Sequence, residues 1–297
     1  MATEWEGKSR GTVLGYRIFI FFIKKLGLDF SYFFLHFVVL YFCFFSLSSS
    51  RAIFYYFHKR RHYGKLKSLL SIYRSYYSFG QTLIDKAAIS SGLRNRFSYT
   101  FDGIENIKNL LDKNKGGILV SAHVGNFEVA QFFLEEVNAV SKISIITWDR
   151  EHEEIKAYLE TVTSKSSISF IRIQEDLSHI FEIHSALSNG ELVCFTGDRH
   201  IEGAKFLEHS LMGETAKFPL GPFLLASRLN FPVLFVYVMK ESKKKYHLYA
   251  RTTKVKRGDA QGLLKAYVDN LEWILDKYPF QWFNYFNFWG KKENLKP

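Results

Sequence analysis

Short apolar runs alternate with stretches of helical periodicity over most of this chain. Runs rich in branched and aromatic residues predict strands, and apolar residues three and four positions apart predict helices. Strands are expected at 97–101, 117–121, 143–147, 169–173, 192–196, 232–239 and 246–253, and helices at 103–113, 126–138, 152–163, 176–188, 219–229 and 260–277. This alternation predicts an α/β fold in which helices flank a mixed, mainly parallel sheet. Because no repeat or linker divides this part, we expect one domain over residues 63–297.

The N-terminal part has a different pattern. Residues 30–47 form an apolar run of 18 residues that is interrupted only by Ser31, His36 and Ser46. As a helix this run would be about 27 Å long, slightly short of a hydrocarbon core of about 30 Å. Nine of the sixteen residues 30–45 are aromatic, which is typical of the membrane interface.

Charge supports the same view of this segment. The net charge is +11, and residues 1–75 hold 12 Lys and Arg against 3 Asp and Glu, so the remainder carries only +2. A basic, aromatic segment is typical of an anionic membrane surface, whereas a nearly neutral globular part argues against a nucleic-acid partner. We expect residues 1–62 to anchor the protein to a membrane, with a buried hairpin as the alternative. A signal peptide is not expected, because basic helical sequence follows the run without a clean cleavage site.

Three consecutive serines, residues 48–50, follow the apolar run. We expect residues 48–50 to end the run and to cap a helix that continues to about Arg61. A further helix is expected over residues 65–88.

Cys43 and Cys194 are the only cysteines, so a disulfide framework and a zinc site with paired cysteines are both excluded. No glycine-rich nucleotide loop is evident, and we expect neither a metal nor another cofactor.

The most informative stretch is residues 117–130, GILVSAHVGNFEVA. It predicts a buried strand, then His123 at the strand's end, a tight turn at Gly125, and a helix capped by Asn126. Glu128 would lie in the first helical turn, where its carboxylate could orient the imidazole and leave the other ring nitrogen as a general base. The alternative is that Glu128 only complements the helix dipole.

The surrounding residues add a resemblance. The stretch 121–128, SAHVGNFE, is similar to the His-x4-Asp/Glu motif of the lipid A biosynthesis lauroyl/myristoyl acyltransferases, a branch of the lysophospholipid acyltransferase superfamily. Further matching blocks lie in the same order along the chain, at 103–106, 197–199, 213–216, 218–222, 225–226, 232–233 and 278–283. An N-terminal hydrophobic anchor is also typical of that family.

The resemblance implies a membrane-bound enzyme that moves a fatty acyl chain from acyl carrier protein to a hydroxyl of a lipid A-type glycolipid precursor. Its partners would be acyl carrier protein, the lipid acceptor and the bacterial inner membrane, with the site on the cytoplasmic side. His123 would be the base and Glu128 its orienting acid. Amides near Gly125 or a nearby cation would bind the oxyanion. Asp198 and Arg199 end another strand and are expected in the same crevice, with a structural ion pair as the alternative. With Gly125 and Asn126 they are the expected substrate-binding residues.

Other functions stay open at this point. The same chemistry could act on an aminolipid or an aryl-polyene-type pigment precursor, and a non-catalytic basic membrane-surface protein is a more distant alternative. The family's Tyr-Arg-Pro block matches Thr147–Arg150 only with a register shift, so no role is assigned to Arg150.

Two further patches have alternative interpretations. The aromatic segment 282–289 could line an acyl-chain tunnel or simply form core. Lys243, Lys244 and Lys245 could dock the acidic carrier protein or form a solvated hairpin turn.

Overall fold

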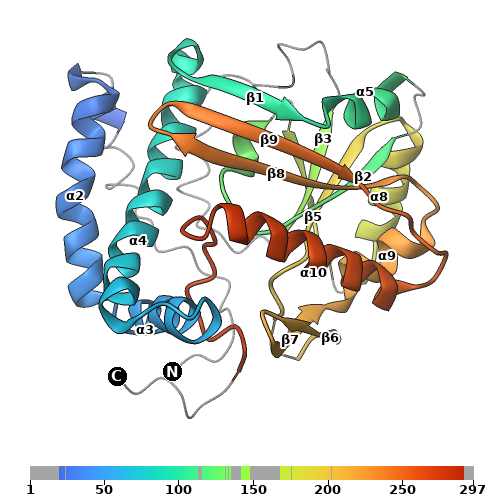
Figure 1. Cartoon of the computed structure of the whole chain (residues 1–297). Coiled ribbons are helices and arrows are strands. Elements are labelled where there is room, and N and C mark those ends of the chain that lie inside the picture. The colour runs from blue at the N-terminus through green and yellow to red at the C-terminus, as the bar shows by residue number, and fades with distance from the viewer. Residues whose placement is uncertain are drawn as a thin grey trace.

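The computed structural model describes residues 20–112 except 24, residues 116–134 except 131 and 133, residues 142–147, and residues 168–290 except 175 and 202. Within these residues, seven strands form one sheet in the order β1-β9-β8-β2-β5-β3-β4 (Figure 1). The strands are β1 (Ser98–Asp102), β2 (Gly117–Ser121), β3 (Ile143–Thr147), β4 (Ile168–Arg172), β5 (Leu192–Thr196), β8 (Val233–Ser242) and β9 (Lys245–Thr252). Only the β8–β9 pair is antiparallel, so the sheet is mixed and mainly parallel, as predicted.

Alternating strand residues fill two apolar cores, one on each face of the sheet. Ile118 and Val120 of β2 belong to the larger core, whereas Leu119 between them belongs to the smaller one. This follows from strand geometry, because successive side chains point to opposite faces. All five residues of β2 are buried, which explains why its sequence is continuously apolar and does not alternate.

Helices cover both faces. The smaller core is completed by α5 (Ile104–Asp112), and the larger one by α8 (His179–Ser188), α9 (Leu220–Arg228) and α10 (Ala260–Lys277). The Asp259 side chain caps α10 by accepting from the Gly262 amide at 2.8 Å. A one-turn 3₁₀ helix, η4 (Phe127–Val129), follows β2.

The N-terminal helices pack onto this α/β unit. They are α2 (Leu28–Phe45), α3 (Leu47–Tyr55), the π-helical turn η1 (Tyr56–Arg60) and α4 (Lys65–Ala88), followed by two short turns, η2 (Ile89–Leu93) and η3 (Arg94–Arg96). Helices α2 and α4 lie side by side at one edge of the molecule (Figure 1). The buried face of α2 joins the same apolar core as the sheet.

Most of the predicted elements are confirmed, including β2, β3, β5, α4 and α10 at the residues expected. The break after the apolar run was wrongly placed. It lies at Ser46, and the serines at 48–50 are inside α3, where Ser49 and Ser50 are buried and the Ser50 hydroxyl is 3.2 Å from that of Tyr76. The helix expected at 152–163 and much of that at 126–138 lie outside the described residues.

A hairpin was missed. Strands β6 (Phe206–Leu211) and β7 (Glu214–Pro219) pair as a separate antiparallel ribbon. Met212 and Gly213 form its turn, and both have positive φ (50° and 77°), which is the two-residue geometry that suits strand twist. Its sequence signal was weak because a methionine stands at a turn position that usually holds Asn, Asp or Gly.

Candidate functional site

The site is built where two adjacent parallel strands end. In the register of β2 with β5, Ser121 pairs with Thr196, so both strands reach their carboxyl ends together. His123 lies two residues beyond Ser121, and Asp198 lies two residues beyond Thr196. Carboxyl ends of parallel strands form the usual ligand crevice of α/β sheets. Sheet pairing thus brings together two side chains that are 75 positions apart.

Asp198 is the carboxylate that holds His123 in the described part of the chain. Its Oδ1 lies 2.7 Å from Nδ1 of the imidazole, and its Oδ2 accepts the backbone amide of His123 at 2.9 Å. Asp198 is fully buried, whereas the His123 side chain keeps about a quarter (26%) of its surface exposed. The carboxylate is therefore inside the protein, and the ring extends from it toward solvent.

Two side chains from the C-terminal segment complete the shell around Asp198. Trp282 Nε1 donates to Oδ2 at 3.1 Å, and Asn284 Nδ2 donates to the same oxygen at 2.7 Å. A buried carboxylate is stable only when its lone pairs are satisfied in this way. Neither role followed from the sequence: Trp282 belonged to the matching block 278–283 and to the aromatic segment 282–289, and Asn284 belonged to that segment without a role of its own.

The charge states follow from these contacts. Burial alone would raise the pKa of Asp198, but His123, its hydrogen bonds and Arg199 outweigh burial and hold that pKa at about 2. Burial lowers the pKa of His123, the positive charge of Arg199 lowers it further, and Asp198 only partly opposes them. At neutral pH the imidazole is therefore neutral. Because Asp198 is ionised, Nδ1 carries the proton and Nε2 carries the free lone pair.

The loop that bears His123 is clamped by the C-terminal segment. Val124 forms an antiparallel bridge with Trp282, the Phe283 amide donates to the His123 carbonyl at 2.9 Å, and the Gly125 amide donates to the Gln281 carbonyl at 2.9 Å. The segment 282–289 is largely buried and its rings pack against one another, which agrees with the core interpretation of this patch.

Gly125 is required by its geometry. Its φ is +60°, and a Cβ here would lie 2.1 Å from the Val238 carbonyl oxygen. The Asn126 amide donates to that same carbonyl at 2.7 Å. The amides of Gly125 and Asn126 are thus bonded to backbone carbonyls of their own fold. This differs from the expectation that amides near Gly125 bind an oxyanion.

Asn126 also departs from its expected capping role. It precedes η4, but its side chain makes no cap hydrogen bond. Instead it is buried, and its Nδ2 donates to the Thr82 carbonyl at 3.0 Å and to the Tyr246 hydroxyl at 3.3 Å. The backbone of Glu128 lies in η4, but its side chain is outside the described part of the structure, as is the whole of Arg150. The expected contact between Glu128 and His123 therefore stays a prediction.

Arg199 directly follows Asp198 beyond the end of β5 and lies beside the His123–Asp198 pair. Its Nε donates to Asn284 Oδ1 at 2.9 Å, and one terminal nitrogen donates to the Phe283 carbonyl at 3.3 Å. Asn284 thus bridges Arg199 to Asp198. The arrangement fixes a guanidinium charge close enough to lower the pKa of His123. Chemically, the site offers a base, a buried anion behind it and a cation beside it.

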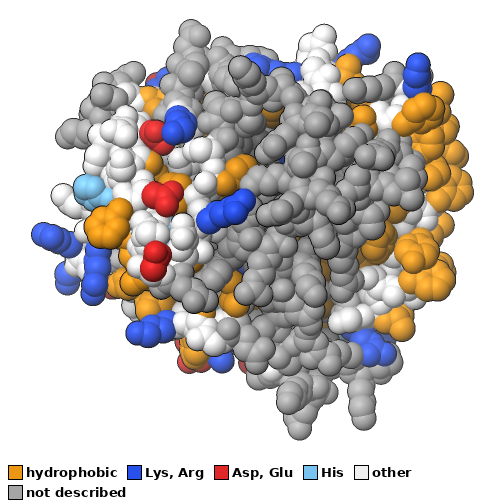
Figure 2. Space-filling model, turned by 180° about the vertical axis from the view of Figure 1, so that it is seen from behind, with side chains coloured by type: hydrophobic (Ala, Val, Ile, Leu, Met, Phe, Trp, Pro, Cys, Tyr) orange, Lys and Arg blue, Asp and Glu red, His pale blue; other side chains and the backbone are white. Residues whose placement is uncertain are grey.

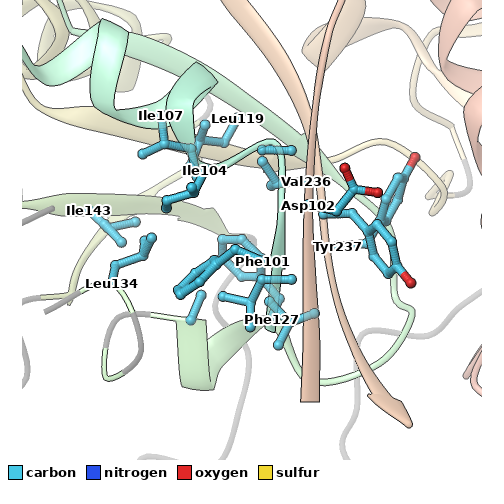
Figure 3. A pocket seen from close by; sticks show the side chains of 15 residues that line it. Phe101, Asp102, Ile104, Ile107, Leu119, Phe127, Leu134, Ile143, Val236 and Tyr237 are labelled. Carbon is cyan, nitrogen blue, oxygen red and sulfur yellow. The ribbon is translucent and has the colours of Figure 1, made fainter. Parts of the chain in front are cut away.

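A small apolar cavity of about 20 Å³ lies near the same loop (Figure 3). Phe127, four residues after His123, is on its wall, with Leu119 of β2 and Ile107 of α5. Figure 3 shows aliphatic side chains at one end of the pocket and the carboxylate of Asp102 near the other. Its lining is almost entirely apolar, and its volume is close to that needed for a single water molecule, so it is a small gap in the core. Among the described residues no group of three or more His, Cys, Asp or Glu could hold a metal ion.

The comparison with protein families decides the identity of the chain. Residues 72–290 match the family model of the bacterial lipid A biosynthesis acyltransferases. The chain belongs to this family. No curated protein matches it.

The matched region of this acyltransferase contains every residue of the candidate site, from the strand end that carries His123 to the segment that carries Asn284. Helices α2 and α3 precede it. The family match therefore supports acyl transfer by the α/β unit and leaves the role of the N-terminal helices to structural argument.

Proposed function

We propose that this acyltransferase moves a fatty acyl chain from an acyl carrier protein thioester to a hydroxyl of a lipid A-type glycolipid precursor, with His123 as the catalytic base. The observation that carries the proposal is the imidazole held at 2.7 Å by the ionised Asp198 at adjoining strand ends. Acyl transfer and lipid A biosynthesis follow from the family. The donor and the acceptor follow from the resemblance of the motif around His123.

The chemistry needs no nucleophile from the protein. His123 Nε2 takes the proton of the acceptor hydroxyl as its oxygen attacks the thioester carbonyl carbon. Asp198 stabilises the imidazolium that forms, without taking its proton. The tetrahedral intermediate then expels the carrier's thiolate, which receives the proton from Nε2. Products are the acyl ester and the free thiol, and His123 returns to its neutral state. Arg199, whose charge acts on His123, is the cation that we assign to the developing oxyanion.

We place the enzyme at the bacterial inner membrane with its site toward the cytoplasm, where the carrier protein would be encountered. Helix α2 is long and apolar enough to cross a membrane, with a mean hydropathy of 1.8, and is a candidate anchor. The face of α2 turned away from α4 exposes Phe33, Phe37 and Phe44. Figure 2 shows hydrophobic side chains gathered along the edge where α2 lies, with Lys and Arg near both ends in this view. Residues 1–62 remain our proposed attachment segment.

The three lysines after β8 have local partners. Lys243 and Lys244 pair with Asp29 of α2, and Lys245 pairs with Glu241. The hairpin turn expected there is confirmed by β8 and β9. Docking of the carrier protein on these lysines stays a prediction.

The deciding experiment compares His123→Ala with the matched control His184→Ala, which removes an exposed histidine on α8. Full-length protein in detergent or vesicles would be given acyl carrier protein thioester and lipid A precursor, with ester formation and donor hydrolysis measured separately. We expect the His123 variant to lose transfer while it keeps the melting temperature of the control. Transfer at the control's rate would refute the mechanism.

The same assay addresses the alternatives. Transfer to an aminolipid or an aryl-polyene-type precursor, but not to a lipid A precursor, would reassign the acceptor and keep the chemistry. Lack of transfer to every acceptor by the wild-type protein would favour the non-catalytic membrane-surface alternative.

A further inference from the structure

A second buried polar cluster lies behind the site loop, at the junction of α2, α4 and the β8–β9 hairpin. Its centre is Asp85 of α4, which is fully buried. The carboxylate accepts hydrogen bonds from the hydroxyls of Tyr32 and Tyr246 and forms an ion pair with Lys240. Lys240 and Tyr246 pair directly across the hairpin, so their side chains reach the carboxylate from the same face.

This cluster reaches the site loop through one hydroxyl. Tyr246 donates to Asp85 and accepts from Asn126 Nδ2 at 3.3 Å, and Asn126 is three residues from His123. The second Asn126 contact, to the Thr82 carbonyl of α4 at 3.0 Å, orients the amide, because a carbonyl can only accept. The cluster also contacts the C-terminal segment that binds the His123 loop. The Gln281 side chain donates to the Lys240 carbonyl at 2.7 Å and accepts the Lys240 backbone amide at 2.9 Å.

The cluster reaches the apolar helix α2 through another hydroxyl. Tyr32, which lies on the buried face of α2, bonds both to Asp85 and to the Lys243 carbonyl at 3.0 Å. Ionic contacts of Asp29 with Lys243 and Lys244 reinforce the same junction at the surface. Helix α2 thus supplies a hydrogen-bond donor, the Tyr32 hydroxyl, to the Asp85 carboxylate, which in turn binds Tyr246 next to the site loop.

We propose that Tyr246 is a positioning residue for His123, acting through Asn126, and that α2 shares in this support through Tyr32 and Asp85. The effect on turnover rests on the function proposed above, whereas the effect on the loop does not. A buried polar network with several donors on one carboxylate admits few arrangements, so it fixes the loop more narrowly than apolar packing does. A loop displaced by as little as 1 Å is enough to lower turnover by about a hundredfold.

The test uses single-hydroxyl deletions in the full-length protein. Tyr246→Phe cuts the link to Asn126, and Tyr32→Phe cuts the link to α2. Tyr56→Phe is the control, because the buried Tyr56 hydroxyl has no hydrogen-bond partner in the described part of the chain. For each variant we would measure kcat and KM, the pH profile of kcat/KM, and amide hydrogen exchange of peptides covering residues 117–130 and 260–277.

For Tyr246→Phe we expect a tenfold or greater loss of kcat with little change in KM, and faster exchange in 117–130 but not in α10. Asn126→Ala should give the same losses, and the double variant should add little to either single one, since both break one link. Tyr32→Phe should also speed amide exchange in residues 117–130, but by a smaller factor than Tyr246→Phe.

The outcomes separate the two proposals. Exchange and kcat of Tyr246→Phe equal to those of Tyr56→Phe would overturn the positioning role. If Tyr246→Phe does not fold, Asn126→Ala and Tyr32→Phe decide by the same criteria. If the wild-type enzyme transfers no acyl group, the exchange data still test the link from Tyr246 to the loop, and only the proposed function fails.

Discussion

Asp198 binds His123 twice, through the backbone amide at 2.9 Å and through the imidazole Nδ1 at 2.7 Å. A single buried carboxylate therefore sets both the path of the loop and the orientation of the ring it carries. Neither contact can change without disturbing the other. This gives Asp198 a larger role than an acid that only stabilises positive charge.

Replacement of Asp198 by Asn should lower kcat by about 10³-fold or more, because an amide cannot accept from every donor that surrounds this position and the imidazole tautomer is no longer held. KM should change little. Steady-state kinetics with a folded variant, verified by circular dichroism, would measure this. Glu128→Gln in parallel tests the carboxylate expected from the motif, and a larger loss there than in Asp198→Asn would make Glu128 the orienting acid.

The pH dependence should show a base that loses its proton below the usual histidine range. Burial and Arg199 lower the pKa of His123. We therefore expect kcat/KM to increase with pH, with a midpoint below about pH 6.5, and to be independent of pH around neutrality. Arg199→Gln removes one cause of the lowering, so its midpoint should move to higher pH. A midpoint that moves down in this variant, or not at all, would contradict the assigned charge interaction.

Substitution of Gly125 by Ala should disrupt the site loop. The new Cβ would lie 2.1 Å from the Val238 oxygen and 2.9 Å from the Met239 sulfur, so the loop must shift away from β8, and this shift disturbs its contacts. Gly213→Ala is the matched control, since Gly213 also has positive φ (+77°) but nothing lies within 4 Å of its Cβ position. Gly213→Ala should lower the free energy of unfolding by about 1 kcal/mol, because alanine is strained at a positive φ. Thermal unfolding should show a larger loss for Gly125→Ala, and activity should fall only there.

Polar substitution on the outer face of α2 should release the protein from membranes. Phe33, Phe37 and Phe44 are each more than half exposed, so their joint replacement by Ser removes apolar contact with lipid without opening the core. Sedimentation with anionic vesicles would measure binding. Phe181→Ser is the control, because Phe181 is 80% exposed on α8 and lies outside this face. Equal binding by the triple variant and the control would place the attachment elsewhere.

The sequence alone determined the alternation of strands and helices, the buried character of β2 and the position of His123 at its end. These features are local, because side-chain periodicity and turn residues lie within a few positions of one another. The family resemblance also depended on local blocks, and the family match confirmed it.

Only the tertiary structure decided which groups surround His123. Asp198 reaches it from a segment 75 positions away, and Trp282 and Asn284 bind Asp198 from a third segment. No local pattern records that β2 and β5 are neighbours in the sheet. Asn126 shows the same limit: its position suggested a helix cap, but its amide satisfies buried partners on α4 and β9. Hydrophobic periodicity specifies which face of an element is buried, whereas strand order and register decide which polar groups meet there.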